Sequence, residues 1–182
     1  FKARFGIYVK RYKNELNDLN GGRLRESLQK MRAGQASGME GWRVAELKRL
    51  PEVLLDRLAF FYNVVEHTGA WPASLERALV TLIPKGSGMD PASLRPITVM
   101  SVIYRLWAAS RLKEATSWQE QWIHQGKCGA RPGMSTEDVY WTLAARLEHA
   151  VLYGEPLYGF NLDYEKCYDK LPQNILLSLA GD

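Results

Sequence analysis

The segment Leu157–Pro172 reads LYGFNLDYEKCYDKLP, and its pattern decides the fold predicted for the chain. An apolar run ends at Asp163, and Tyr168 and Asp169 follow five and six residues later. Because side chains alternate along a strand, a strand over Leu157–Asp163 would place Asp163 on its more polar face, at the carboxyl end. A carboxylate fixed there suits Mg²⁺, which prefers carboxylate and phosphate oxygens. Taken alone, the segment is better explained by a solvated loop that begins at Asp163, because Asp often opens loops.

The composition is typical of a soluble globular protein. Of the 182 residues, 46% are hydrophobic and 24% are charged, which allows one large domain or two small ones. No apolar stretch approaches the roughly 18 residues of a membrane span, and the start of the chain lacks the apolar core of a signal peptide. Cys128 and Cys167 stand apart, which excludes a disulfide framework or a zinc knuckle and suits a reducing compartment. We therefore expect an intracellular protein, nuclear or cytoplasmic, without a membrane partner.

Positive charge is concentrated at the start of the chain. Residues 1–32 hold nine basic and three acidic side chains, a net charge of +6, so the rest of the chain carries −2 of the formal +4. A basic end on a nearly neutral body is compatible with contacts to a nucleic-acid phosphate backbone. It is equally compatible with a solvated helical surface, and charge alone does not decide between the two.

Hydrophobic periodicity predicts a helix-dominant α+β fold. Pro51 divides one helical stretch into two helices, because its ring and its missing N–H end the first, and Gly69 suits the end of the second. One apolar face of that second helix is predicted to consist of Leu54, Leu58, Phe61, Tyr62 and Val65. The other predicted elements are helices over Arg23–Ala33, Ser101–Gln121 and Ser135–Leu152 and after Pro172, and strands over Ala78–Pro84, Ile97–Met100 and Leu157–Asp163.

The stretch LDYEKCYDKLP closely resembles the first catalytic-aspartate motif of reverse transcriptases, particularly those of non-LTR (LINE-type) retrotransposons and group II introns. In that family an apolar strand ends in Asp, an aromatic residue follows five positions later and a second Asp six positions later, and an apolar residue and often Pro come next. The matching residues here are Asp163, Tyr168, Asp169, Leu171 and Pro172.

Three upstream segments resemble further blocks of the same family, in the same order. LIPKGSGMDPASLRPITVMSVIYRLWAASRL is similar to the fingers segment, and QGKCGARPGMSTEDV is similar to the block that follows it. ASGMEGWRVAELKRLP is similar to the Gly-x-Asp-Gly element that precedes the fingers, although Glu40 replaces the usual Asp and Met39 the usual Pro. The four blocks span Ala36–Pro172, which is 137 of the 182 residues.

The resemblance implies the fingers and the start of the palm of a right-hand polymerase, truncated before the second catalytic strand pair. It divides the chain into a basic helical extension over 1–35, a fingers-like region over 36–152 and the start of the palm over 153–182. The parent would be an RNA-directed DNA polymerase of a retroelement, a nucleotidyltransferase that depends on Mg²⁺, with Mn²⁺ as a substitute. Its partners would be an RNA template, a DNA primer, dNTPs and the remaining palm and thumb of the polymerase chain.

The resemblance also assigns roles to individual residues. Asp163 would bind both catalytic Mg²⁺ ions, and the backbone carbonyl of Tyr164 would be a second ligand to one of them. Tyr168 would exclude the ribose 2′-OH by steric clash, and Lys85 and Arg95 would hold the incoming triphosphate. The residues expected along the template strand are Gly129, Arg131, Gly133 and Ser135.

Several simpler alternatives stay open. Tyr168 is also compatible with a core aromatic, Lys85 with a solvated lysine, and Asp169 with a local cap. The sequence contains no aromatic-x-Asp-Asp motif, which supplies the other catalytic carboxylates in this family, so the chain is expected to be inactive on its own. The alternative to a polymerase fragment is a non-catalytic nucleic-acid-binding or helical interaction domain derived from a decayed retroelement.

Overall fold

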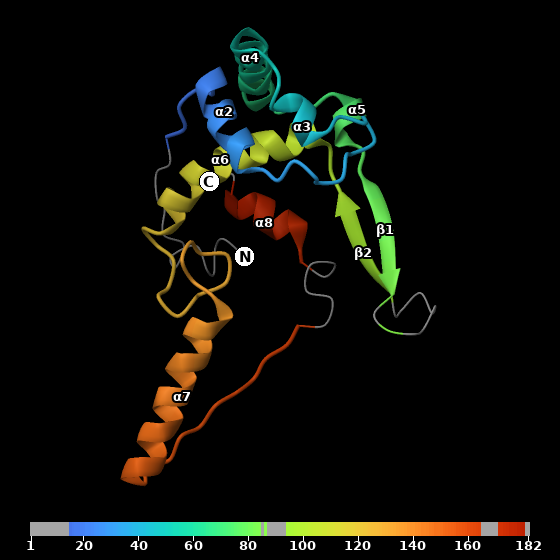
Figure 1. The fold of residues 1–182 in the computed structure, drawn as a ribbon. Coiled ribbons are helices and arrows are strands. Elements are labelled where there is room, and N and C mark those ends of the chain that lie inside the picture. Colours follow the sequence, from blue (N-terminus) through green and yellow to red (C-terminus); the bar gives the residue numbers. More distant parts are fainter. Residues whose placement is uncertain (1–14, 85, 87–93, 165–170, 181–182) are drawn as a thin grey trace. The chain divides into compact units, whose positions relative to one another are not determined.

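A computed structural model describes residues 15–84, 86, 94–164 and 171–180 (Figure 1). The chain forms two compact units, one over 14–121 and one that combines 1–13 with 122–182. The described elements are helices together with one two-stranded antiparallel sheet, which agrees with the predicted α+β class. Among the described helices, none combines the length and the apolar character needed to cross a membrane.

Local sequence signals mark several helix ends of the first unit, although the helix predicted over Arg23–Ala33 forms over Gly21–Lys30. Asn20 caps α2 (Gly21–Lys30) by accepting a hydrogen bond from the Arg23 amide at 3.0 Å. Pro51 separates the short helix α3 (Val44–Leu47) from α4 (Glu52–Thr68). Gly69 ends α4 with a φ of 68°, a left-handed conformation that favours glycine. The remaining helices of this unit are α5 (Ala73–Glu76) and α6 (Val102–Gln119).

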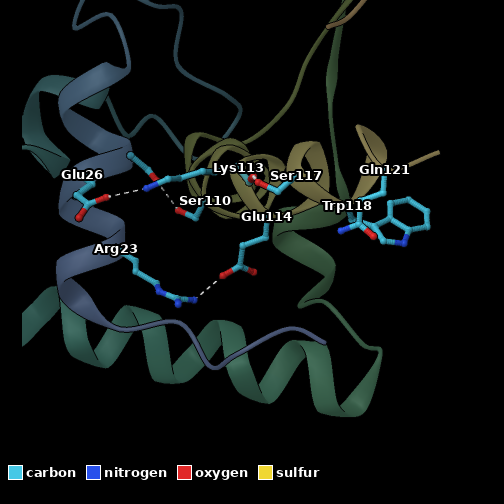
Figure 2. Close-up of a pocket in the computed structure, with 9 residues that line it drawn as sticks. Arg23, Glu26, Ser110, Lys113, Glu114, Ser117, Trp118 and Gln121 are labelled. Atoms are coloured by element: carbon cyan, nitrogen blue, oxygen red, sulfur yellow. Dashed lines mark hydrogen bonds and ion pairs between the residues drawn. The ribbon is translucent and has the colours of Figure 1, made fainter. Parts of the chain in front are cut away.

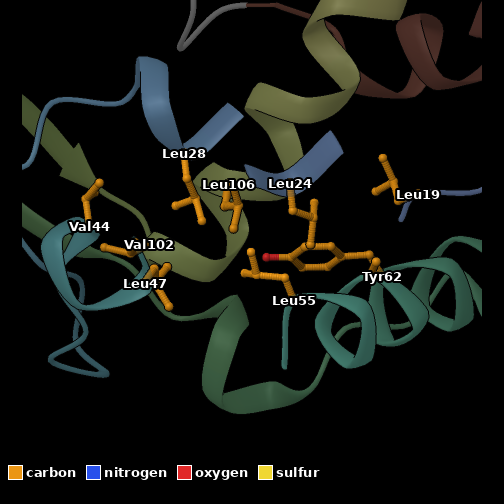
Figure 3. Close-up of a cluster of buried hydrophobic side chains, with 10 residues drawn as sticks. Leu19, Leu24, Leu28, Val44, Leu47, Leu55, Tyr62, Val102 and Leu106 are labelled. Atoms are coloured by element: carbon orange, nitrogen blue, oxygen red, sulfur yellow. The ribbon is translucent and has the colours of Figure 1, made fainter. Parts of the chain in front are cut away.

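The core of the first unit forms where α2 packs against α4 and α6 (Figure 3). Tyr62 is fully buried in it, and its hydroxyl donates a 2.7 Å hydrogen bond to the Ile103 carbonyl. Burial raises the pKa of the Tyr62 phenol, so the hydroxyl stays a neutral donor. The buried hydrophobic residues of this core are Leu19, Leu24, Leu28, Val44, Leu47, Leu55, Ala59, Tyr62, Val102 and Leu106.

The apolar face predicted for α4 is wrong at one position. Leu54 is 44% exposed, whereas Leu55 is fully buried. Two hydrogen bonds explain this orientation of the helix. Asn63 Oδ1 accepts from the Leu19 amide at 2.8 Å, and Asp56 Oδ1 accepts from the Gly21 amide at 2.9 Å. These two contacts turn α4 so that the side carrying Asp56, Ala59 and Asn63 faces α2. A pattern of apolar residues alone contains no information about such contacts.

Two predicted strands form an antiparallel hairpin. β1 (Leu79–Pro84) pairs with β2 (Leu94–Val99), and β2 begins three residues earlier than predicted. Leu79 lies opposite Val99 and Ile83 lies opposite Arg95. Since cross-strand partners share a face, the apolar side chains lie on both faces of this hairpin. Most of them are exposed, so the hairpin gains little support from packing.

The second unit contains α7 (Thr136–Tyr153) and α8 (Gln173–Ala180), both as predicted. The strand predicted over Leu157–Asp163 is wrong, because this stretch is irregular. A strand must pair its backbone N–H and C=O groups with a neighbour, and no described strand pairs with this stretch. Phe160 is accordingly 94% exposed. The three-part division of the chain stays a prediction, although α2 of the basic extension contributes to the core of the first unit.

Candidate functional site

The hairpin carries the clearest candidate contact for a phosphate. Arg95 is exposed on β2, opposite Ile83, and Pro84 ends β1 next to this pair. Among the described residues Arg95 has no hydrogen-bond or ion-pair partner, so its five N–H donors are available for a bidentate contact. Lys85 follows Pro84 in the sequence but lies outside the described residues.

The predicted magnesium ligands lie on an exposed irregular segment. Asp163 and the Tyr164 carbonyl are oxygen donors of the type that Mg²⁺ prefers. In the described part of the chain, however, no group of three or more His, Cys, Asp or Glu side chains is placed to bind a metal ion. Tyr168 and Asp169 lie outside that part. The described residues therefore supply two donors of the right chemistry but not a complete site.

The residues predicted along the template strand lie in and next to the loop before α7. Gly129 and Gly133 are exposed, and Gly133 has a φ of 71°, which a side chain would strain. Arg131 donates to the carbonyls of Gln125 at 3.4 Å and Lys127 at 3.2 Å, so it helps to hold the loop together.

The start of α7 is occupied by its own side chains. The Ser135 hydroxyl accepts from the Glu137 amide at 3.1 Å, and the Ser135 amide donates to Asp138 Oδ2 at 2.6 Å. This is a complete capping box. The carboxylates of Glu137 and Asp138 would also repel a phosphate, so the expected anion contact at Ser135 finds no support in this geometry.

Arg95 belongs to the first unit, whereas the other described candidates, Asp163, Tyr164 and the loop residues, belong to the second. Residues Gln35–Gly41, which we call the clamp loop, contain the segment GMEG that resembles the Gly-x-Asp-Gly element, but the sequence assigned this loop no structural role. This loop is fastened to the start of α6, which follows β2 in the chain.

Three hydrogen bonds and one close backbone approach fasten the clamp loop. Glu40 Oε1 accepts from the Val102 amide at 2.6 Å, which satisfies one of the free N–H groups at the start of α6. Arg105 donates to the Gln35 side chain at 3.3 Å and to the Ala36 carbonyl. Gly38 lies so close that a Cβ atom on it would be 2.7 Å from Ser101 Cα. The loop and the junction between β2 and α6 are thus in direct backbone contact.

A charged network fixes α6 to α4 further along the helix. Arg111 is 8% exposed and donates to Glu66 Oε1 at 2.6 Å and Oε2 at 2.5 Å. Its remaining donors reach Glu114 at 2.6 Å and the Asn17 carbonyl at 2.8 Å. Trp107 Nε1 donates to Glu66 Oε1 at 2.6 Å. Burial opposes ionisation of Glu66, but the Arg111 and Trp107 hydrogen bonds and the Arg111 charge outweigh it, and the pKa of Glu66 is lowered.

We expect this network to make stability depend on pH. Because the pKa of Glu66 is lower in the folded state, its contribution is complete above the ordinary value of 4.5 and is lost as the pH falls through the folded value. The free energy of unfolding of the wild type should exceed that of Glu66→Gln most at neutral pH. The difference should shrink between about pH 5 and about pH 2 in urea titrations. A difference that stays constant from neutral pH into this range would contradict the assignment.

A pocket of about 330 Å³ lies between α2 and α6 (Figure 2). Arg23 pairs with Glu114 across it at 2.5 Å, and Lys113 pairs with Glu26 at 3.4 Å. Its two cations and two anions balance, so it is not a phosphate site. Arg25 of α2 donates to the Lys48 carbonyl at 2.9 Å and to the Leu50 carbonyl at 2.5 Å. These two arginines of the basic extension therefore stabilise the fold.

No model of a known protein family matches the chain, and no curated protein matches it. The case for a function therefore depends on the residues themselves. Of the described candidates, Arg95 has the geometry most suited to a ligand, because it is exposed, lies in a regular strand and has no hydrogen-bond or ion-pair partner in the described part of the chain. Asp163 and Tyr164 have suitable donor chemistry on an irregular segment.

Proposed function

We propose that this chain is the fingers and first palm portion of an RNA-directed DNA polymerase of a retroelement. Four motif blocks in the family's order support the proposal. The hairpin adds to this support, because Ile83 and Pro84 of the Ile-Pro-Lys segment end β1, the Arg-Pro-Ile segment lies in β2, and Arg95 pairs with Ile83. The main support is the guanidinium of Arg95, which is exposed and has no hydrogen-bond or ion-pair partner among the described residues. Such a group is suited to the triphosphate of an incoming dNTP.

In this proposal each described group has a limited task. Arg95, with Lys85, binds the triphosphate, while Gly129, Arg131 and Gly133 lie near the template strand. The capping box leaves no such task for Ser135. Asp163 and the Tyr164 carbonyl would contribute oxygen ligands to a Mg²⁺ ion. Polymerisation would also need the carboxylates of an aromatic-x-Asp-Asp motif, which these 182 residues do not contain.

Titration of the chain with a dNTP in the presence of Mg²⁺ tests the proposal. We expect Arg95→Ala to weaken binding about tenfold, because a bidentate charged contact is lost. Arg95→Lys should recover only part of the affinity, since lysine keeps the charge but not the planar fork. Arg77→Ala is the matched control, because Arg77 is exposed shortly before β1. Equal affinity of Arg95→Ala and the wild type would contradict the proposal.

A nucleic-acid-binding module without catalysis is the second candidate. It is favoured by the irregular, exposed segment around Asp163, because no group of three or more His, Cys, Asp or Glu side chains in the described residues is placed to bind a metal ion. This candidate predicts salt-dependent binding to a primer–template that Arg95→Ala and Asp163→Ala leave unchanged. Binding that is lost with either substitution would favour the polymerase fragment.

A further inference from the structure

The orientation of the hairpin depends on the point where β2 joins α6. β1 and β2 expose apolar side chains on both faces, so packing does little to fix their direction. β2 ends at Val99 and α6 begins at Val102, with the buried residue Ser101 between them. Because the hairpin has few packing contacts, the direction of β2 depends on the point where the strand joins the rest of the unit, which is the first turn of α6.

Glu40 holds that first turn from a distant part of the chain. Ser101 caps the Ile103 amide at 3.1 Å, but the Val102 amide depends on Glu40 Oε1, at 2.6 Å. The carboxylate also lies at the positive end of the α6 dipole, which adds an electrostatic attraction. Glu40 contacts the helix amide and not the hairpin, so any effect on Arg95 must pass through the junction between β2 and α6.

We propose that Glu40 is a positioning residue: by holding the start of α6, it fixes the direction of the hairpin and hence the place of Arg95. The inference rests on the proposed triphosphate site. When Glu40 is removed, the Val102 amide loses its acceptor, and the short connection through Ser101 becomes a hinge. The hairpin then spends only part of its time in the binding orientation, and the apparent affinity for a triphosphate falls in proportion.

The first test measures the hairpin directly, independent of any ligand. Spin labels are placed on Thr81→Cys in β1 and Arg57→Cys in α4, two exposed positions of the first unit, after Cys128 and Cys167 are replaced by Ser. We expect a narrow distance distribution in the wild type. Glu40→Ala should broaden it most, and Glu40→Gln should broaden it less, because Gln keeps an acceptor but loses the charge.

Glu46→Gln is the matched control. Glu46 Oε2 accepts from the Arg43 amide at 2.8 Å, so this variant loses the same charge from a similar cap on α3 instead of α6. It should leave the distribution narrow. Gly38→Ala is a second way to disturb the clamp loop, since its Cβ would collide with Ser101, whereas Gly34→Ala has open space and should have no effect. Circular dichroism checks that each variant is folded.

The second test is the Mg²⁺–dNTP titration of the same variants. If Glu40→Ala reduces the fraction of molecules with a binding-competent hairpin to about one fifth, the dissociation constant of the dNTP rises about fivefold. Glu46→Gln should leave the dissociation constant unchanged. A folded Glu40→Ala variant with an unbroadened distribution would overturn the inference. So would a broadened distribution with unchanged, Arg95-dependent affinity. Triphosphate binding that does not depend on Arg95 in the wild type would instead refute the proposed function, whatever the distances show.

Discussion

Glu66→Ala is expected to destabilise the first unit by about 3 kcal/mol, because it leaves the guanidinium of Arg111 buried without its main partner. Arg111 donates two hydrogen bonds to Glu66, at 2.6 and 2.5 Å, and is only 8% exposed. The loss should appear in urea unfolding as a lower midpoint with an unchanged slope. Glu114 would still accept from Arg111 at 2.6 Å, which places the cost at the lower end of the range for buried pairs.

An exposed ion pair that joins α6 to α2 provides the control. Lys113 and Glu26 lie 3.4 Å apart with side chains 71% and 63% exposed. Glu26→Ala should therefore change stability by only about 0.5 kcal/mol. A double-mutant cycle of Glu66→Ala with Arg111→Met should show strong coupling, since the double variant leaves no buried charge unpaired. Additive effects of the two substitutions would contradict a direct interaction.

Helix boundaries could be predicted because their signals are local. Pro51 and Gly69 bracket α4, and Ser135 with Asp138 starts α7, all through contacts within a few residues of the chain. The hairpin was also predictable, because β-branched and apolar runs flank a glycine-containing loop. Such features are specified by the residues next to them, and tertiary contacts only reinforce them.

The face of α4 and the role of Glu40 could not be predicted, because the contacts that decide them are distant in the sequence. Asp56 and Asn63 accept from amides 35 and 44 residues away, and Glu40 reaches an amide 62 residues away. Apolar periodicity says which residues prefer burial but not which polar groups turn the helix. A close resemblance to a motif likewise assigned Glu40 no structural task.

The predicted strand over Leu157–Asp163 failed for a related reason. Alternation of side chains is a local pattern, but a strand exists only with a partner for its backbone. The resemblance assigns Asp163 a role as a Mg²⁺ ligand, which stays a prediction. The position of its carboxylate depends on a neighbouring strand that the motif does not contain, so the motif predicts the chemistry of the donor and not its conformation.

Tyr62→Ala is expected to destabilise the first unit by about 3–5 kcal/mol, because it removes a fully buried ring and leaves a cavity. The ring lies against Phe61 and Trp71, with centroids 5.7 and 6.2 Å away, so few neighbours can move to fill the space. Tyr62→Phe should cost only about 1 kcal/mol, since it keeps the ring and loses one hydrogen bond. Urea unfolding followed by circular dichroism measures both, and equal losses would contradict the cavity argument.

Tyr62→Phe also separates the two supports of α6. Tyr62 holds the Ile103 carbonyl from α4, while Glu40 holds the amide of the preceding residue from the clamp loop. If Glu40 alone sets the direction of the hairpin, Tyr62→Phe lowers the stability of the unit without broadening the distance distribution between β1 and α4. A broadening as large as that of Glu40→Ala would mean that any loosening of the first turn of α6 releases the hairpin. The specific role of Glu40 would then be refuted even though its hydrogen bond is real.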